Sequence, residues 1–335
     1  MRAFEIQHGF GLENITLTER PEPHPGPGEV LLRMRAFSLN YRDLLVARGV
    51  YNPKLKLPFV PLSDGVGEVV AVGDGVTRVR RGDRVATMFM QHWVRGPISE
   101  AAARSALGGA LPGVAAEFVV LHEEGVSPVA EHLSDEEAAT LPCAALTAWN
   151  ALIIQGNLRE GDTILIQGTG GVSLFALQFA RMHGARVIAT SGSDRKLSRV
   201  RELGAAEGVN YKTTPEWGDR VRELCGGMGV DHVVEVGGAG TLPQSLKAVK
   251  FGGRISLIGV LAGGSQFNPI QILMKHVCVQ GIFVGSRAMF EEMNRALAQH
   301  RTRPVVDRVF SFAELPQALR YLESGAHFGK ICLKV

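Results

Sequence analysis

The sequence predicts an α/β fold in which a doubly wound parallel sheet accompanies a second, mostly-β part. Residues 163–190 follow the pattern of strand, glycine turn, helix and strand. Strand and helix patterns then alternate to about residue 285, which is typical of a parallel sheet with crossover helices. Residues 1–125 instead hold short strand patterns separated by turns rich in Gly and Pro.

The composition is that of a globular protein long enough for two domains. The 335 residues include 36 basic and 33 acidic side chains, a net charge of +3, without a basic cluster interleaved with aromatic residues. We therefore expect no nucleic-acid partner. The N-terminus begins as a strand and not as a signal peptide, and the four cysteines stand far apart, which argues against a disulfide framework. The apolar stretch 163–180 is broken by three glycines, so we expect it to be buried in a cytoplasmic protein and not to enter a membrane.

The first part of the chain is expected to build a sheet from several longer strands. They are Glu29–Ala36, Asp64–Val72, Arg84–Phe89 and Val114–Leu121. Residues 92–113 are rich in Ala and Gly and poor in strand signal, and we expect them to form an excursion over the surface. A capping box at Ser134 then begins a helical pattern, which continues through Ala138–Ile154 with an interruption at Pro142.

The second part is expected to alternate strands with helices. The strands are Thr163–Gln167, Arg186–Thr190, Val209–Asn210, His232–Val236, Arg254–Gly259 and Val277–Val284. The helices between them are Val172–His183, Asp194–Leu203, Glu216–Leu224, Leu242–Val249 and Ile270–Met274. Six such strands fit a doubly wound parallel sheet. The tail adds helices at Ala288–His300 and Ala313–Ser324 and a last strand at Lys330–Val335, so the chain returns to its first domain.

The turn at Gly168, Gly170 and Gly171, before Val172, has the residues that hold the pyrophosphate of a dinucleotide. Free N–H groups at a helix N-terminus attract phosphate, and glycines leave room for it. The usual Gly-x-Gly-x-x-Gly/Ala pattern has Ser173 at its third position, so the turn alone would also suit a connection without a ligand. Together with the flanking strand and helix, it indicates NAD(P) chemistry.

The end of the second strand predicts NADP(H) in preference to NAD(H). An acidic residue ends this strand in NAD-specific folds, whereas Ser191 stands there in this sequence and Ser193, Arg195 and Lys196 follow. Hydroxyls and cations suit a 2′-phosphate, to which Arg195 can make paired hydrogen bonds. We expect Asp194 to cap the next helix and not to bind ribose. The alternative for Arg195 and Lys196 is an ordinary solvated turn of a helix.

Several short motifs follow one another along the chain. They are Pro27-Gly-Glu-Val30, Asn40-Tyr-Arg-Asp43, Gly65-Val-Gly67 through Gly73, Gly82-Asp-Arg-Val85, Leu141-Pro142 with Thr147-Ala148, the glycine turn and Gly329-Lys330. In this order they resemble the motifs of the medium-chain dehydrogenase/reductase family, in its zinc-free, quinone-oxidoreductase-like branch. The resemblance implies a GroES-like, mostly-β catalytic domain over residues 1–125 and 286–335, and a Rossmann NADP-binding domain over residues 126–285.

The resemblance also implies that no zinc is bound. The zinc enzymes of the family would carry Cys at the position of Asn40, a His-Glu pair at Ser63-Asp64 and a third ligand at Cys143, and only the last is present. A catalytic zinc needs three N, S or O ligands; Asp64 could coordinate, but Asn40 and Ser63 are poor substitutes. The structural zinc loop of the family would fall in residues 92–113, which contain no cysteine.

By the same resemblance, further residues are expected to contact the nucleotide. Tyr211, after the third strand, would lie over the adenosine phosphate, and Thr147 would lie beside the nicotinamide, although Thr147 could equally bond its own helix backbone. The remaining expected cofactor contacts are Gly237, Gly259, the backbone of Phe283-Val284, and Lys330.

Without zinc, the reaction that requires the fewest catalytic groups from the protein is reduction of an activated C=C bond or a quinone. Hydride adds at carbon, and the enolate takes a proton from Tyr or water. The candidate catalytic residues are Asn40, Tyr41, Asp43 and Tyr51. The resemblance to enoyl-thioester reductases of the family places Tyr51 at the proton-donor position. Asn40 could donate to a carbonyl oxygen, Tyr41 line the pocket and Asp43 orient a partner. The alternative is that both tyrosines are wall residues and solvent supplies the proton.

We therefore expect an NADPH-dependent reductase of a small electrophile, a quinone or an enone. The alternatives are an alcohol dehydrogenase with an unconventional metal site and a catalytically silent NADPH-binding sensor. In this family the last strand of the cofactor sheet pairs with its twin, and residues 277–283 have the β-branched and aromatic character of such an edge, so we expect a homodimer. The same composition would also suit a buried central strand.

Overall fold

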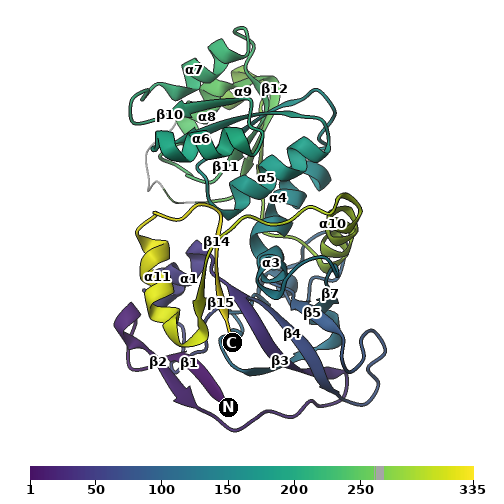
Figure 1. Cartoon of the computed structure of the whole chain (residues 1–335). Coiled ribbons are helices and arrows are strands. Elements are labelled where there is room, and N and C mark those ends of the chain that lie inside the picture. Colours follow the sequence, from purple (N-terminus) through teal and green to yellow (C-terminus); the bar gives the residue numbers. More distant parts are fainter. Residues whose placement is uncertain (260, 262–267) are drawn as a thin grey trace. The chain divides into compact units, whose positions relative to one another are not determined.

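The computed structural model describes residues 1–259, 261 and 268–335, and the chain divides into two compact units (Figure 1). Unit 1 comprises Met1–Leu146 and Gly285–Val335, and unit 2 comprises Thr147–Val284. The first boundary thus lies later in the chain than residue 125, where the sequence placed it. The reason is that residues 126–139 add a strand and a helix to the sheet of unit 1.

Unit 1 contains all the described strands that lie outside the parallel sheet. They are β1 (Arg2–Ile6), β2 (Ile15–Glu19), β3 (Glu29–Ser38), β4 (Asp64–Val72), β5 (Arg84–Thr87), β6 (Phe118–His122), β7 (Val126–Pro128), β14 (Val306–Ser311) and β15 (Lys330–Lys334). Its helices are α1 (Tyr41–Ala47), α2 (Glu100–Ala103), α3 (Asp135–Ala139), α10 (Arg287–His300) and α11 (Leu315–Glu323), with short turns η1 (Leu12–Asn14), η2 (Glu123–Gly125), η3 (Leu141–Ala145) and η5 (Phe312–Glu314). The strands β2, β7 and β14 and the helices α1 and α2 were not predicted.

The sheet of unit 1 brings the two ends of the chain together. Its strands run in the order β14-β15-β3-β4-β5-β7, and β6 also pairs with β3. The last strand, β15, lies antiparallel to β3 with Cys332 opposite Ser38. Leu39 N–H also bonds the carbonyl oxygen of Ile331 at 3.0 Å. This register places Lys330 beside the residues that follow β3, where α1 begins.

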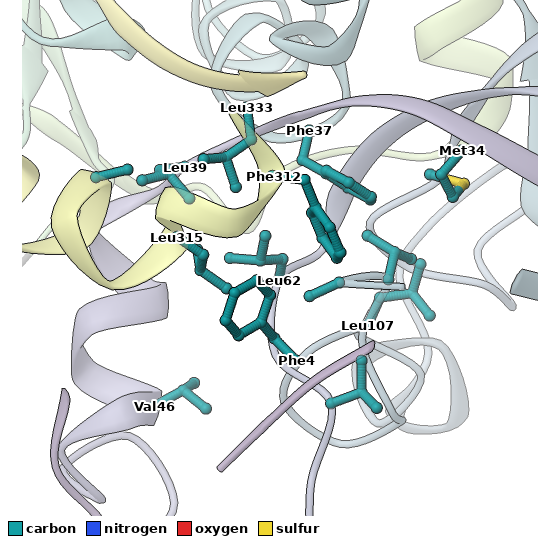
Figure 2. Close-up of a cluster of buried hydrophobic side chains, with 14 of the residues drawn as sticks. Phe4, Met34, Phe37, Leu39, Val46, Leu62, Leu107, Phe312, Leu315 and Leu333 are labelled. Carbon is teal, nitrogen blue, oxygen red and sulfur yellow. The ribbon is translucent and has the colours of Figure 1, made fainter. Parts of the chain in front are cut away.

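The core of unit 1 gathers side chains from segments that are far apart in the sequence (Figure 2). The ring of Phe312 packs 5.1 Å from that of Phe4 and 5.3 Å from that of Phe37, between centroids. Leu107 belongs to the same cluster. The prediction of a surface excursion over residues 92–113 is therefore wrong for its inner part, since Trp93, Ala106 and Leu107 are buried.

Unit 2 is an alternation of strands and helices. Its strands are β8 (Thr163–Gln167), β9 (Arg186–Ser191), β10 (Glu207–Asn210), β11 (Val230–Glu235), β12 (Val249–Leu257) and β13 (Cys278–Gly281). Its helices are α5 (Gly171–Met182), α6 (Asp194–Glu202), α7 (Trp217–Leu224), α8 (Leu242–Ala248) and α9 (Ile270–Met274), preceded by α4 (Leu146–Trp149) and η4 (Asn150–Ile154). The predicted strand over 277–284 was too long, because residues 282–284 leave the sheet.

The sheet of unit 2 is parallel throughout, in the order β10-β9-β8-β11-β12-β13. This order reverses between β8 and β11, as in a doubly wound fold, which confirms the predicted class. Leu165 packs with apolar residues of α7 and α8 on one face. Ile164 and Ile166, which alternate with it and face the other side, are also fully buried. A parallel sheet covered on both faces explains the continuous apolar pattern of its strands.

The helical pattern predicted over 138–154 is interrupted in the structure. The capping box at Ser134 is confirmed, and α3 ends at Ala139. Residues 141–145 and 150–154 then form wider, π-type turns on either side of α4. Pro142 lies at the start of this region, where its missing N–H is tolerated. Among the helices of the described ranges, we find none that has the length and apolar character needed to cross a membrane.

We predict that Phe37→Ala destabilises unit 1. The fully buried ring fills the cluster around Phe312, so its removal should cost about 3–5 kcal/mol of unfolding free energy. Urea denaturation followed by circular dichroism measures this cost. Met228→Ala is the control, because Met228 is 73% exposed and its loss should change stability by less than about 0.5 kcal/mol. Equal losses for the two variants would contradict the assignment of the core.

Candidate functional site

The turn between β8 and α5 has the backbone that phosphate binding needs. Gly168 has a φ of 70°, a conformation that favours glycine, and Gly170 is the N-cap of α5. A Cβ atom added at either glycine would meet no other atom within 4 Å, so the space over the turn is open. Ser173, the departure from the usual motif, is buried and donates to the carbonyl oxygen of Gln167 at 2.6 Å. The turn therefore fits a pyrophosphate at the N–H groups of Gly171 and Val172.

A buried carboxylate joins this turn to the loop after β11. Glu235, at the end of β11, is fully buried and accepts hydrogen bonds from several neighbours. They are Gly237 N and Gly238 N at 2.9 Å, Gln167 Nε2 at 2.7 Å, and the hydroxyls of Thr241 and Ser245. Because Gln167 precedes Gly168, the network fixes two loops that follow neighbouring strands. The sequence analysis missed both Gln167 and Glu235, which look like ordinary strand ends.

Two glycines that were predicted to contact the cofactor have a packing role in the structure. A Cβ atom at Gly237 would lie 2.2 Å from Thr241 Oγ1, and one at Gly259 would lie 2.2 Å from the carbonyl oxygen of Val236. Glycine is therefore favoured at position 237 by the Thr241 side chain that packs on it, and at position 259 by the close approach of the Val236 backbone. This packing is independent of any ligand, and their contact with a cofactor stays a prediction.

The predicted adenosine-binding residues come together at the ends of β9 and β10. Ser191 Oγ accepts from Ser193 N at 3.3 Å, and Ser193 Oγ caps α6 by accepting from Lys196 N at 3.4 Å. A Cβ atom at Gly192 would lie 2.8 Å from the hydroxyl of Tyr211, so the Tyr211 side chain covers this turn.

Positively charged side chains outnumber the Asp194 carboxylate at the carboxyl ends of β9 and β10. Asp194 is not the cap that the sequence predicted, because its carboxylate accepts from Asn210 Nδ2 at 2.8 Å. Arg195 and Lys212 are exposed, and neither side chain has a hydrogen bond or ion pair within the part of the chain that the structure describes. With Lys196 nearby, the carboxylate is outnumbered by three cations. Such an arrangement attracts an anion.

The residues predicted for the nicotinamide end are also joined within unit 2. Thr147 is buried, and Asn150 lies three residues later in the next helical turns. Asn150 Nδ2 donates to the carbonyl oxygen of Val284 at 2.7 Å. Val284 has a φ of 53°, which is strained for a β-branched residue, and this hydrogen bond helps to hold it. Phe283 beside it is partly exposed.

In unit 1 the candidate catalytic residues surround the start of α1. Asn40 is the N-cap, and its N–H donates to Asp43 Oδ2 at 2.8 Å. The ammonium group of Lys330, which is only 4% exposed, lies 2.7 Å from Asn40 Oδ1 and also donates to the carbonyl oxygen of Leu39. Lys330 was predicted to contact the cofactor, whereas the structure places its amine in a hydrogen-bonded position among the candidate catalytic residues.

Asp64 is the second buried carboxyl group of this cluster. Its Oδ1 accepts from Ser63 Oγ at 2.7 Å, and its Oδ2 accepts from Cys143 N at 3.1 Å. The sequence analysis considered Asp64 only as a substitute metal ligand. Asp64 lies two strands away from Lys330 in the sheet, and nothing in the sequence indicates that the two side chains belong to one cluster.

Burial controls the protonation of this cluster. It raises the pKa of Asp43 to about 6, against the opposing effects of the Arg42 guanidinium and the N–H of Asn40. Burial likewise raises the pKa of Asp64, with Lys330 and Ser63 acting in the opposite direction. Burial and the nearby Asp64 raise the pKa of the Cys143 thiol to about 12, so it is protonated at neutral pH.

The two candidate tyrosines differ in their surroundings although both are 41% exposed. Arg42 lies between Tyr51 and Phe89, with its guanidinium carbon 5.5 Å and 4.3 Å from the ring centroids. Arg42 Nη2 also donates to the carbonyl oxygen of Leu107 at 2.6 Å. Tyr51 is thus held by a cation–π contact, which the sequence analysis missed. Tyr41 is the first residue of α1.

The residues present at the family's zinc-ligand positions do not assemble a metal cluster. Among the described residues, no three His, Cys, Asp or Glu side chains are placed to hold a metal ion. Asn40, Asp64 and Cys143 do lie in one region of unit 1, but Asn40 Oδ1 and both carboxyl oxygens of Asp64 accept hydrogen bonds from other protein groups.

Comparisons with known proteins find matches for residues of both units. Residues 26–131 match the family model for the alcohol dehydrogenase GroES-like domain, and residues 171–299 match the one for zinc-binding dehydrogenase. A zinc-type alcohol dehydrogenase-like protein of Schizosaccharomyces pombe is 44% identical over 92% of this chain and 91% of its own length.

Other similar proteins carry other activities in their names. The acryloyl-coenzyme A reductase of Metallosphaera sedula is 31% identical over 99% of both chains. The structure of a quinone oxidoreductase from Coxiella burnetii superposes with a TM-score of 0.82 at 27% identity, over 100% of this chain and 99% of that one. The names therefore agree on an oxidoreductase that uses this fold and differ in the substrate.

We predict that the stability difference between Asp43→Asn and the parent protein depends on pH. The folded protein holds the Asp43 proton more tightly than the unfolded chain does, because the pKa rises from 3.8 to about 6. The stabilisation that protonated Asp43 gives is complete below pH 3.8 and is lost as the pH rises through 6. The variant should therefore gain about 2–3 kcal/mol relative to the parent between pH 4 and pH 7.

Urea denaturation at a series of pH values measures this difference. Asp83→Asn is the control, since Asp83 lies in a surface turn of the same unit. A difference between Asp43→Asn and the parent that is independent of pH would contradict the raised pKa.

Proposed function

Because the chain belongs to the medium-chain dehydrogenase/reductase family, we propose that it is a zinc-independent, NADPH-dependent reductase of quinones or α,β-unsaturated carbonyl compounds. The observation that carries this proposal is the buried ammonium of Lys330 on Asn40. It lies among the residues that stand at the family's zinc-ligand positions. The Lys330 ammonium thus supplies a fixed positive charge to this part of the site without a metal ion.

The donor set at those positions does not fit zinc. Asn40 Oδ1 already accepts from Lys330, and both oxygens of Asp64 accept from groups of the chain. Burial and the neighbouring Asp64 raise the pKa of the Cys143 thiol, so without a metal this group is protonated and is not a preformed thiolate ligand. A zinc ion would also have to lie near the Lys330 ammonium, which would repel it. The proposed reaction therefore has no step at a metal ion.

The glycine turn fits NADPH, which when bound would supply a hydride to the electrophilic carbon of the substrate. The π pair of the C=C bond would then form a double bond between the α-carbon and the carbonyl carbon, and the π pair of the C=O bond would move onto oxygen. The resulting enolate takes one proton at the α-carbon, so that the product is the saturated carbonyl compound. A quinone takes the same hydride and one proton to become a hydroquinone. In this scheme Asn40 contacts the oxygen that gains charge, and Tyr51 or water supplies the proton.

An alcohol dehydrogenase is the second candidate, because the Schizosaccharomyces pombe relative is named as zinc-type. That activity would need a group to take the hydroxyl proton of the alcohol. The experiment that separates the two mixes the purified, chelator-treated protein with NADPH and either 1,4-benzoquinone or 2-cyclohexenone, with NADH in parallel. We expect a fall in NADPH absorbance without added metal. Turnover of alcohols alone, restored by zinc, would refute the proposal.

We predict that Arg195 determines the preference for NADPH. Arg195→Glu should raise the dissociation constant of NADPH about 10- to 100-fold, because a charge-assisted hydrogen bond to the 2′-phosphate is lost. The affinity for NADH should stay unchanged. Fluorescence titration with each nucleotide measures both. Arg104→Glu, on an 80% exposed arginine of unit 1, changes the net charge equally and is the control. Equal weakening of NADPH and NADH would contradict this role.

The edge of the unit 2 sheet supports a homodimer, which is part of the same proposal. Strand β13 lies at the end of the sheet order, and Phe251, Leu273 and Met274 near it are large apolar side chains with high exposure. The N–H of Gly252 bonds the carbonyl oxygen of Lys275, which brings their two segments together. An apolar surface beside an open strand edge fits a second copy of the chain, paired antiparallel about a twofold axis.

We predict that Val279→Pro yields a folded monomer. Ile282 N–H bonds Leu257 of β12, so alternation along the strand directs the N–H of Val279 to the open edge. Proline there removes an edge donor but no bond to β12. Size-exclusion chromatography with light scattering reports the mass, and Gln280→Pro, whose N–H faces β12, should unfold instead. A dimer that persists in Val279→Pro would contradict this interface.

A further inference from the structure

The side-chain amide of Asn40 is held in one orientation by a buried cation. Lys330 Nζ lies 2.7 Å from Asn40 Oδ1 and also donates to the carbonyl oxygen of Leu39. An ammonium group can only donate, so the atom of the Asn40 amide that faces it must be the oxygen. The amide nitrogen is thereby directed away from Lys330.

Asn40 Nδ2 is a buried donor that lacks a hydrogen-bond partner. Asn40 is 8% exposed, and within the described ranges no acceptor meets its Nδ2 with the geometry of a hydrogen bond. The nitrogen faces Asp64 and lowers the pKa of that carboxyl group as a donor would, but an amide nitrogen carries two N–H groups, so at least one of them stays available for another acceptor. A buried donor that the protein leaves unpaired in a candidate site is suited to an acceptor on a ligand.

We propose that Asn40 Nδ2 donates to the carbonyl oxygen of the substrate and that Lys330 is the positioning residue that orients and polarises this amide. The proposal rests on the reductase function proposed above. The hydrogen bond from the ammonium draws electron density toward Oδ1, which makes the N–H groups on Nδ2 better donors. Lys330 thus acts through Asn40 and is not a ligand of the nucleotide.

The charges around the pair allow an oxygen to gain negative charge next to Asn40. Lys330 is near Asp64 and Asp43 and also faces the thiols of Cys143 and Cys332. Burial raises the pKa of both thiols to about 12, so they carry no charge at neutral pH, and the Lys330 ammonium offsets the charge of the two carboxyl groups that would oppose an anionic substrate oxygen. The Arg42 guanidinium adds a second cation beside Asp43, 3.9 Å away.

The step in which this donor acts is the hydride transfer. The two electrons of the hydride, taken from NADPH, form the new C–H bond at the electrophilic carbon. The π electrons of the C=C bond form the enolate double bond to the carbonyl carbon, and the π electrons of the C=O bond move onto its oxygen, which becomes an enolate oxygen bonded to Asn40 Nδ2. Protonation of the enolate carbon by Tyr51 or water completes the product. The Asn40 donor is therefore most useful when negative charge is greatest on this oxygen.

The test compares variants of Asn40 and Lys330 with the parent protein. Asn40→Asp keeps the oxygen for Lys330 and a good N-cap but removes the N–H donors, and Asn40→Ser removes them without adding charge. Lys330→Met removes the ammonium, and Lys330→Arg retains a cation. Each is measured for its thermal unfolding, its NADPH dissociation constant by fluorescence, and kcat and KM with 2-cyclohexenone and with 1,4-benzoquinone.

We expect both Asn40 variants to lower kcat with 2-cyclohexenone about 100-fold, and Lys330→Met to lower it about 10- to 100-fold, as for the loss of one oxyanion donor. Lys330→Arg should retain more activity than Lys330→Met. The losses should be smaller with 1,4-benzoquinone, which needs less help to accept hydride. The NADPH dissociation constant should stay within about twofold of the parent, because neither side chain touches the nucleotide. Asn40→Ser combined with Lys330→Met should be no slower than Asn40→Ser alone.

Lys334→Met is the matched control, since Lys334 lies on the same strand with its side chain 68% exposed. It should leave every value unchanged. Lys330→Met with weaker NADPH binding and an unchanged kcat would identify Lys330 as a nucleotide ligand and overturn the proposal. Independent, multiplicative losses in the double variant would also overturn it. A parent protein that reduces neither substrate would refute the reductase function itself, whereas an active parent with insensitive variants refutes only the roles of Asn40 and Lys330.

Discussion

A lysine ammonium that is removed from water needs hydrogen-bond acceptors and counter-charges, and the candidate catalytic residues of unit 1 are arranged around one. Lys330 finds its acceptors at Leu39 and Asn40 because β15 lies beside β3 in the register that pairs Cys332 with Ser38. The counter-charges come from Asp64 on β4 and Asp43 on α1. Three separate segments must therefore be in place before the cation can be buried. The same contacts fix the Asn40 amide and use the oxygen atoms that a metal would need.

Unit 2 likewise contains a buried acidic side chain, Glu235, that is held by hydrogen bonds. The buried carboxylate of Glu235 is bonded to backbone N–H groups and side chains from two loops, one of which begins at the glycine turn. The loops that follow β8 and β11 are thus fixed before a nucleotide arrives, and the turn itself stays open. Preorganisation of this kind reduces the entropy that binding must overcome. In both units a buried charge holds the segments that we assign to function.

The parts of the fold that the sequence revealed are those encoded by local pattern. The glycine turn, the parallel strands and the capping box at Ser134 depend on neighbouring residues, and each was found within a few positions of its place. The site of unit 1 depends instead on pairing across the sheet. Nothing next to Lys330 in the sequence shows that Asn40, some 290 residues earlier, supplies its acceptor. Asp194 likewise looked like a helix cap until Asn210 on the neighbouring strand appeared as its partner.

The central claim is that the reaction needs no metal because the chain supplies its own cation. The most direct test measures metal content by mass spectrometry and NADPH-dependent turnover of 2-cyclohexenone on one sample, before and after treatment with a chelator. We predict full turnover with far less than one zinc per chain and no loss after chelation. One zinc per chain, with activity that disappears on chelation and returns with zinc, would contradict the claim.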